Sequence, residues 1–203
     1  MSMKIRIHNK WRNRDQPRSL EDNAAALAYA AWQIALTAAK NIHAADFHYS
    51  DDHQRTAVIG EYLYFLVHVA DRIAHAGLDP DDRQRFITGM ARETGRHYQR
   101  NLEDLFGRGD YTSRFLNSLN ERAAAYAHTR YGPDGPGYQM RRVLGESIQQ
   151  VMGMDQTNRW VIQQVMDLDA PEAARHLAQA VENLFGTAKL DLTRTGNAVV
   201  GPD

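Results

Sequence analysis

Apolar residues recur every three to four positions along most of the chain, a spacing that places them on one face of a helix. The first such segment covers about residues 19–45 and is rich in alanine. The second covers residues 52–76 and contains the stretch EYLYFLVHVADRIAH, the densest run of large apolar residues in the chain. Gly77 follows it as a natural helix stop. These two segments are therefore predicted to form long helices.

Capping residues define the next two helices. Asp79 is a favourable N-cap for a third helix that runs to Phe106. A fourth helix is expected over 110–131, where aromatic and aliphatic residues form one stripe. The segment GPDGPG at 132–137 is the clearest loop in the sequence, because proline and glycine interrupt helices.

The last part of the chain is predicted to hold two further helices. One long helix is expected over 138–168, with a kink near Gly153 as an option, because its apolar residues stay in phase across that glycine. The other begins at Asp169, which has the features of an N-cap, and ends near residue 190. A complete break near Gly153 would instead make Asp155 an N-cap.

These patterns together predict an all-α fold, a single-domain bundle of about six helices, several of them long. The bundle is expected to span residues 19–190. Residues 1–18 would precede it as a basic N-terminal arm, and residues 191–203 would follow it as a frayed C-terminal tail.

Composition excludes several classes of site. The chain has 203 residues and no cysteine, which excludes disulfides, thiolate nucleophiles and Cys-ligated metal centres. Its longest apolar runs are shorter than the ~20 residues that a membrane span needs. The first 18 residues lack the apolar core of a signal peptide. A cytoplasmic protein that is not inserted into a membrane is therefore expected.

Charge is distributed unevenly along the chain. Residues 1–18 carry six basic residues and one acidic residue, a net of +5, so the remainder must carry -6 to give the overall -1. With Trp11, this arm could contact nucleic-acid phosphates and stack on a base. The acidic body and a pI near 6.8 argue against a nucleic-acid-binding protein. An arm that lies on an acidic neighbouring subunit is at least as well supported.

A polar stripe lies opposite the apolar face of the second predicted helix. At about 100° per residue the stripe and its edge contain Glu61, Tyr64, Phe65, His68, Asp71, Arg72 and His75. The simplest interpretation is a solvent-facing stripe with local pairs three and four residues apart. The preferred interpretation is a half-buried face that contacts another helix or another subunit through Tyr64, Phe65 and Arg72.

A third interpretation of this stripe is a metal or ligand site. Imidazole and carboxylate groups bind divalent transition metals, and helical bundles build such sites from inward-facing side chains. The candidate ligands are Glu61, His68, Asp71 and His75. The Glu-x-x-His pattern of di-iron bundles is absent from the sequence, so a divalent metal is an alternative and no cofactor is predicted.

The stretch HAADFHYSDDH, at residues 43–53, is the second group of titratable residues. It contains His43, Asp46, His48, Asp51, Asp52 and His53. The loop could fold these side chains round a cation. A polar turn in which Asp51 or Asp52 caps the next helix is the preferred interpretation.

Two further pairs stand out on later helices. Glu93 and His97 are one turn apart, which suits the start of a general base or, preferably, an ordinary helix-edge pair. Asp155 and Asn158 fall on an apolar stripe and need polar partners if they are buried.

The sequence contains no phosphate-binding glycine loop, Gly-x-Ser-x-Gly elbow or His-Glu-x-x-His motif. A non-enzymatic protein that acts through protein–protein association is therefore predicted, as a homo-oligomer and most simply a dimer. Tyr64 and Phe65 support this, because a monomer would have to cover both sides of the second helix. The alternatives are a metal- or small-ligand-binding bundle and a nucleic-acid-associated protein that uses its arm.

Overall fold

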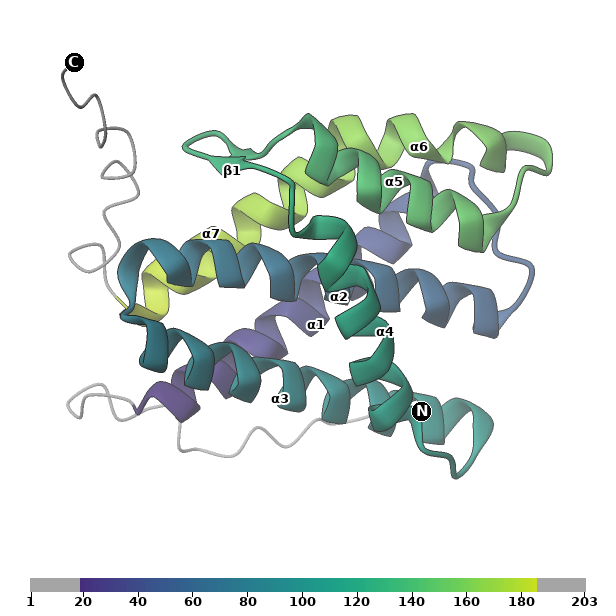
Figure 1. Cartoon of the computed structure of the whole chain (residues 1–203). Coiled ribbons are helices and arrows are strands. Elements are labelled where there is room, and N and C mark those ends of the chain that lie inside the picture. Colours follow the sequence, from purple (N-terminus) through teal and green to yellow (C-terminus); the bar gives the residue numbers. More distant parts are fainter. Residues whose placement is uncertain (1–18, 186–203) are drawn as a thin grey trace, which may run out of the picture.

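The computed structural model describes residues 19–185, and these form an all-α domain (Figure 1). The main helices are α1 (Leu20–Ala44), α2 (Asp52–Gly77), α3 (Pro80–Phe106), α4 (Tyr111–Tyr126), α5 (Tyr138–Met152), α6 (Val161–Gln164) and α7 (Ala170–Phe185). A π-helical turn, η3 (Val165–Asp169), joins α6 to α7 without a break. The predicted single-domain bundle of about six helices, several of them long, is therefore confirmed.

The first four helices begin at the residues that the sequence predicts. The side chains of Ser19, Asp51, Asp79 and Asp110 each accept a hydrogen bond from a backbone N–H in the first turn of the helix that follows. Each bond satisfies a donor that has no partner within the helix. Local sequence is thus sufficient to set these helix starts.

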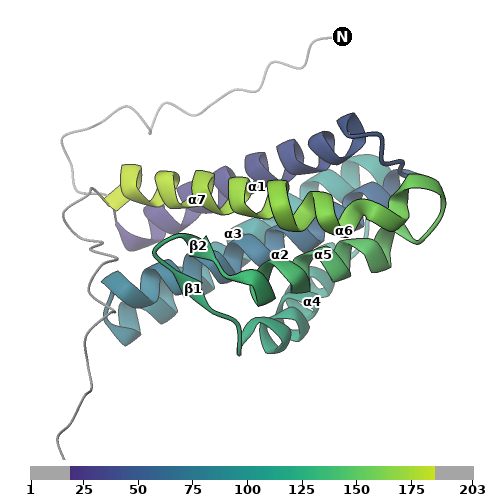
Figure 2. The same cartoon turned by 90° about the horizontal axis from the view of Figure 1, so that it is seen from above.

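Helix α2 runs through the centre of the domain. It contacts α1, α3, α4, α5 and α7, and most of its residues between Thr56 and Ala74 are buried. Helix α4 crosses α2 on one side, while α1 and α7 lie on the opposite side (Figures 1 and 2). Both sides of α2 are therefore covered by helices of the same chain.

The fourth helix ends at Tyr126, earlier than the predicted residue 131. Arg72 of α2 donates hydrogen bonds to the carbonyl oxygens of Tyr126 and Ala127, and the Thr129 hydroxyl donates to the Tyr126 carbonyl. These donors from outside the helix take over the last carbonyls. The chain then forms a short antiparallel hairpin, β1 (Tyr131–Gly132) and β2 (Gly135–Pro136), within the predicted loop region.

The predicted continuous helix over 138–168 is wrong. Helix α5 ends at Met152, and Gly153 adopts a φ of 79°, which an L side chain rarely tolerates. A 3-10 helix, η2 (Gln156–Trp160), follows Asp155, whose side chain makes no capping hydrogen bond. Helices α5 and α6 pack against each other after the break, so the apolar residues of both segments are buried without one continuous helix.

The predicted helix start at Asp169 is also wrong, because η3 continues directly into α7. Pro171 lies just inside α7 and has no N–H to donate to a preceding carbonyl. The wider π-helical turn accommodates the proline ring in an otherwise continuous helix. The carbonyl oxygen of Met166, five residues earlier, accepts a hydrogen bond of 2.9 Å from Nη1 of Arg141 instead.

The predicted arm at 1–18 and tail at 191–203 lie outside the described residues. Between residues 19 and 185, no helix combines the length and apolar character needed to cross a membrane.

Candidate functional site

The polar stripe of α2 lies beneath α4. Glu61 is only 5% exposed, and Arg122 of α4 bonds to both of its carboxylate oxygens, with Nε–Oε2 at 2.8 Å and Nη2–Oε1 at 2.7 Å. Burial of a carboxylate requires such a partner. The pair therefore joins α4 to the central helix.

His68 is half-buried and acts as a hydrogen-bond acceptor. Nε of Arg72 lies 3.3 Å from its Nε2 atom, and its ring stacks on that of Tyr126 at a centroid distance of 4.9 Å. Burial, followed by the charge of Arg72, lowers the pKa of His68 to about 4. The imidazole is therefore neutral near pH 7.

Asp71 and His75 share one arginine from α3. Nε and Nη2 of Arg83 lie 2.8 and 2.6 Å from the two oxygens of Asp71, and its Nη1 lies 3.2 Å from Nδ1 of His75. Glu61 thus pairs with Arg122, His68 with Arg72, and Asp71 and His75 with Arg83. In the described part of the chain, no three His, Asp or Glu side chains are grouped to hold a metal ion. The predicted metal site therefore lacks a preformed ligand set.

The residues predicted to make a contact do contact another helix. Tyr64 and Phe65 are buried, and their rings pack against Phe115 and Tyr126 of α4 at centroid distances of 5.0 and 6.1 Å. Arg72 bonds to the carbonyls that follow α4. These contacts lie within one chain, so they do not require a second subunit.

The titratable residues at 43–53 do not surround a common cation. Asp51 caps α2, and Asp52 pairs with Arg55 at 2.9 Å. His53 stacks on Phe106 with a centroid distance of 3.9 Å. The polar-turn interpretation therefore describes this segment.

The Glu93–His97 pair has a similarly structural role. Glu93 pairs with Arg96, while the His97 ring packs against those of Tyr29 and Trp32. Burial lowers the pKa of His97. The carboxylate therefore does not orient the imidazole as a general base.

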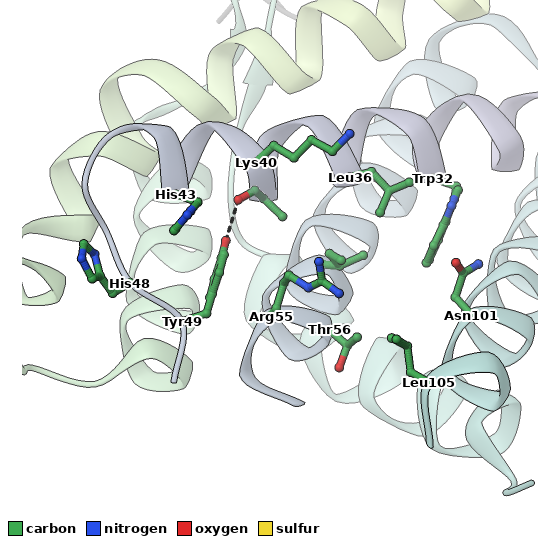
Figure 3. A pocket seen from close by; sticks show the side chains of 12 residues that line it. Trp32, Leu36, Lys40, His43, His48, Tyr49, Arg55, Thr56, Asn101 and Leu105 are labelled. Atoms are coloured by element: carbon green, nitrogen blue, oxygen red, sulfur yellow. Dashed lines mark hydrogen bonds between the residues drawn. The ribbon is translucent and has the colours of Figure 1, made fainter. Parts of the chain in front are cut away.

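A cavity of about 400 Å³ lies between α1, the start of α2 and the end of α3. Its apolar lining includes Trp32, Leu36, Ile59 and Leu105, and its polar lining includes Lys40, His43, His48 and Arg55. Figure 3 shows Arg55 and Thr56 reaching from α2 into the space opposite Leu36 and Trp32, with Leu105 and Asn101 on the α3 side. The volume lies within the range of small-molecule sites.

Two hydrogen-bonded contacts hold the loop wall of this cavity in place. The Tyr49 hydroxyl donates to the Ala39 carbonyl at 2.8 Å, and burial raises the pKa of that hydroxyl. Asn158, which is buried, accepts from the His48 N–H at 3.0 Å and donates to the His48 carbonyl at 2.9 Å. The predicted need of Asn158 for partners is thus confirmed. Its partner His48 lies in the wall of the cavity.

Sequence patterns do not reveal this cavity. Its lining comes from α1, the 45–51 loop, α2 and α3, and it lies among residues that helical periodicity assigns to ordinary helix faces. In the sequence, only the histidines of the 43–53 segment indicated a candidate site in this part of the protein. The fold and the site thus define an all-α protein with a mainly apolar cavity whose lining includes Lys40 and Arg55.

The chain matches no protein-family model, no curated protein and no solved structure. Interpretation of the cavity therefore rests on its own geometry.

Proposed function

We propose that the protein binds a small organic molecule in the cavity between α1, α2 and α3. The observation that carries this proposal is a cavity of about 400 Å³ that combines apolar walls with a few polar groups. Such a combination is typical of ligand sites, where apolar surface supplies affinity and polar groups fix orientation. This proposal corresponds to the small-ligand-binding alternative that the sequence offers, but with the ligand in this cavity and not on the α2 stripe that contains Glu61.

A neutral fluorescent probe, N-phenyl-1-naphthylamine, tests this proposal. We expect saturable one-to-one binding to the full-length protein. Leu105→Trp should weaken it at least tenfold, because the larger ring enters the cavity. Leu168→Trp is the matched control, since Leu168 is exposed and lies outside the cavity lining. No saturable binding, or equal affinity for both variants, would contradict the proposal.

Self-association is a second proposal, and residues other than Tyr64 and Phe65 support it. Tyr64 and Phe65 are covered by α4, but four large apolar side chains between Tyr138 and Leu168 are exposed. They are Tyr138 (59%), Met154 (64%), Trp160 (57%) and Leu168 (58%). Exposed apolar surface favours contacts between copies.

Sedimentation equilibrium at tens of micromolar tests self-association. We expect a species heavier than the 23.0 kDa chain, and Trp160→Glu should shift it toward that mass. Leu105→Glu serves as a control at an exposed apolar residue of α3, outside this group. A single 23 kDa species for the wild-type chain would rule this proposal out.

A further inference from the structure

We propose that the cavity selects an anionic ligand, with an apolar body held by Trp32, a carboxylate or phosphate group held by Arg55, and Lys40 adding positive charge at the α1 rim of the cavity (Figure 3). This inference rests on the proposed function, because it assumes that the cavity is a binding site. It goes further by naming the charge of the ligand and the two side chains that recognise it.

The charge of the lining differs from that of the rest of the chain. Residues after the first 18 carry a net charge of -6. The cavity lining nevertheless includes Lys40 and Arg55, together with two imidazoles, and no aspartate or glutamate. A recess with one sign of charge and apolar walls concentrates the field and attracts counter-ions. The cavity is therefore suited to an anion despite the acidic body.

Lys40 and Arg55 have donors left for such an anion. Nη2 of Arg55 pairs with Asp52, but both side chains are about half exposed, so solvent screening makes that pair weak. A guanidinium group has five N–H donors, and a carboxylate or phosphate can take two of them at once. Lys40 makes no ion pair with any residue between 19 and 185.

The opposite part of the cavity suits an apolar and preferably aromatic group. Trp32 is 6% exposed and contributes its indole ring to the lining, while His97 stacks on that ring at a centroid distance of 6.4 Å. Leu36 and Ile59 extend the apolar wall. In Figure 3, Arg55 lies between the Trp32 end and the His43 end of the cavity. A ligand with an aromatic body and one anionic group can therefore contact both kinds of wall.

Calorimetric titration with four probes that share a naphthalene body tests this inference. The probes are 2-naphthoate, 2-naphthyl phosphate, 2-naphthamide and 2-naphthylmethylammonium. We expect the full-length protein to bind the two anions at least tenfold more tightly than the amide, and the ammonium most weakly. The stronger of the two anions identifies the head group as a carboxylate or a phosphate.

Three variants locate the anion. Lys40→Gln and Arg55→Gln should each weaken anion binding about five- to tenfold and leave amide binding unchanged. Arg142→Gln is the matched control, because Arg142 is exposed on α5 and lies outside the cavity lining. Circular dichroism of each variant verifies the fold.

The outcomes separate the two proposals. If the amide binds as tightly as the anions, the inference of charge selectivity is wrong while the cavity still binds ligands. If the anions are preferred but Lys40→Gln and Arg55→Gln have no effect, the anion binds elsewhere, for example on the basic residues 1–18, and the inference is also wrong. If none of the four probes binds while N-phenyl-1-naphthylamine does, the inference is wrong and the cavity still binds ligands. If that probe does not bind either, the proposed function itself fails.

Discussion

Replacing Glu61 by alanine is expected to lower the free energy of unfolding by about 3 kcal/mol. The substitution leaves the guanidinium group of Arg122 without its partner at a site where the Glu61 side chain is 7% exposed. The expected loss lies at the lower end for buried pairs, because the Arg122 side chain is 30% exposed and can turn toward water. Urea unfolding at pH 7 measures this change.

Glu146→Ala is the matched control for this experiment. Glu146 also pairs with an arginine, Arg142, but both side chains are about half exposed, so the expected loss is ~0–1 kcal/mol. Added Zn²⁺ or Mn²⁺ should leave the Glu61→Ala difference unchanged. A loss that appears only with metal would favour the metal-site interpretation, because bound metal stabilises the folded state. A loss below about 0.5 kcal/mol would show that the pair has no structural role.

Asp169→Asn is expected to stabilise the protein by about 2 kcal/mol at pH 7.5 and to have little effect near pH 4. Asp169 is buried in η3, where it accepts hydrogen bonds from Tyr62 and Gln164 at 3.2 Å. Burial raises the pKa of this carboxyl group to about 6. The folded state therefore holds the proton more tightly than the unfolded chain does. The protonated carboxyl group therefore contributes its full stabilisation of the folded state below about pH 4. That contribution is lost as the pH rises through 6.

Asp167→Asn provides the control, because Asp167 lies in the same π-helical turn and is exposed. We expect this change to alter unfolding by less than about 0.5 kcal/mol at either pH. Urea unfolding of the wild-type chain and both variants at pH 4 and pH 7.5 gives the comparison. If Asp169→Asn destabilises the protein at pH 7.5, the ionised carboxylate is favourable and the expected pH dependence is wrong.

The helices and most of their starts could be predicted because their causes are local. Apolar periodicity depends on residues within one or two turns, and caps such as Asp79 bond to N–H groups two or three residues away. The same reasoning misplaced the helix ends near Tyr126 and Gly153. At Tyr126 the cause is Arg72, which is 54 residues away in sequence. At Gly153 periodicity continued across a break that only the backbone conformation reveals.

The polar stripe of α2 could be located from sequence, but its partners could not. Helical spacing favoured local pairs three and four residues apart, such as Asp71 with His75. The structure pairs Asp71 with Arg83 of α3 and Glu61 with Arg122 of α4. A helix wheel shows which side chains share a face, and it contains no information on which helix covers that face.

The sequence by itself determined that this protein is an all-α domain, where most of its helices begin, and that a segment rich in histidine and aspartate joins the first two long helices. Only the tertiary structure decided that α3 and α4 cover the polar stripe of α2 and that α1, α2 and α3 line an open cavity with Lys40 and Arg55 in its lining. The physical reason is the separation along the chain between the residues that interact. Helix formation depends on neighbours along the chain, whereas the pairing of charges and the shape of a cavity depend on residues that are distant in sequence and meet only when the helices pack.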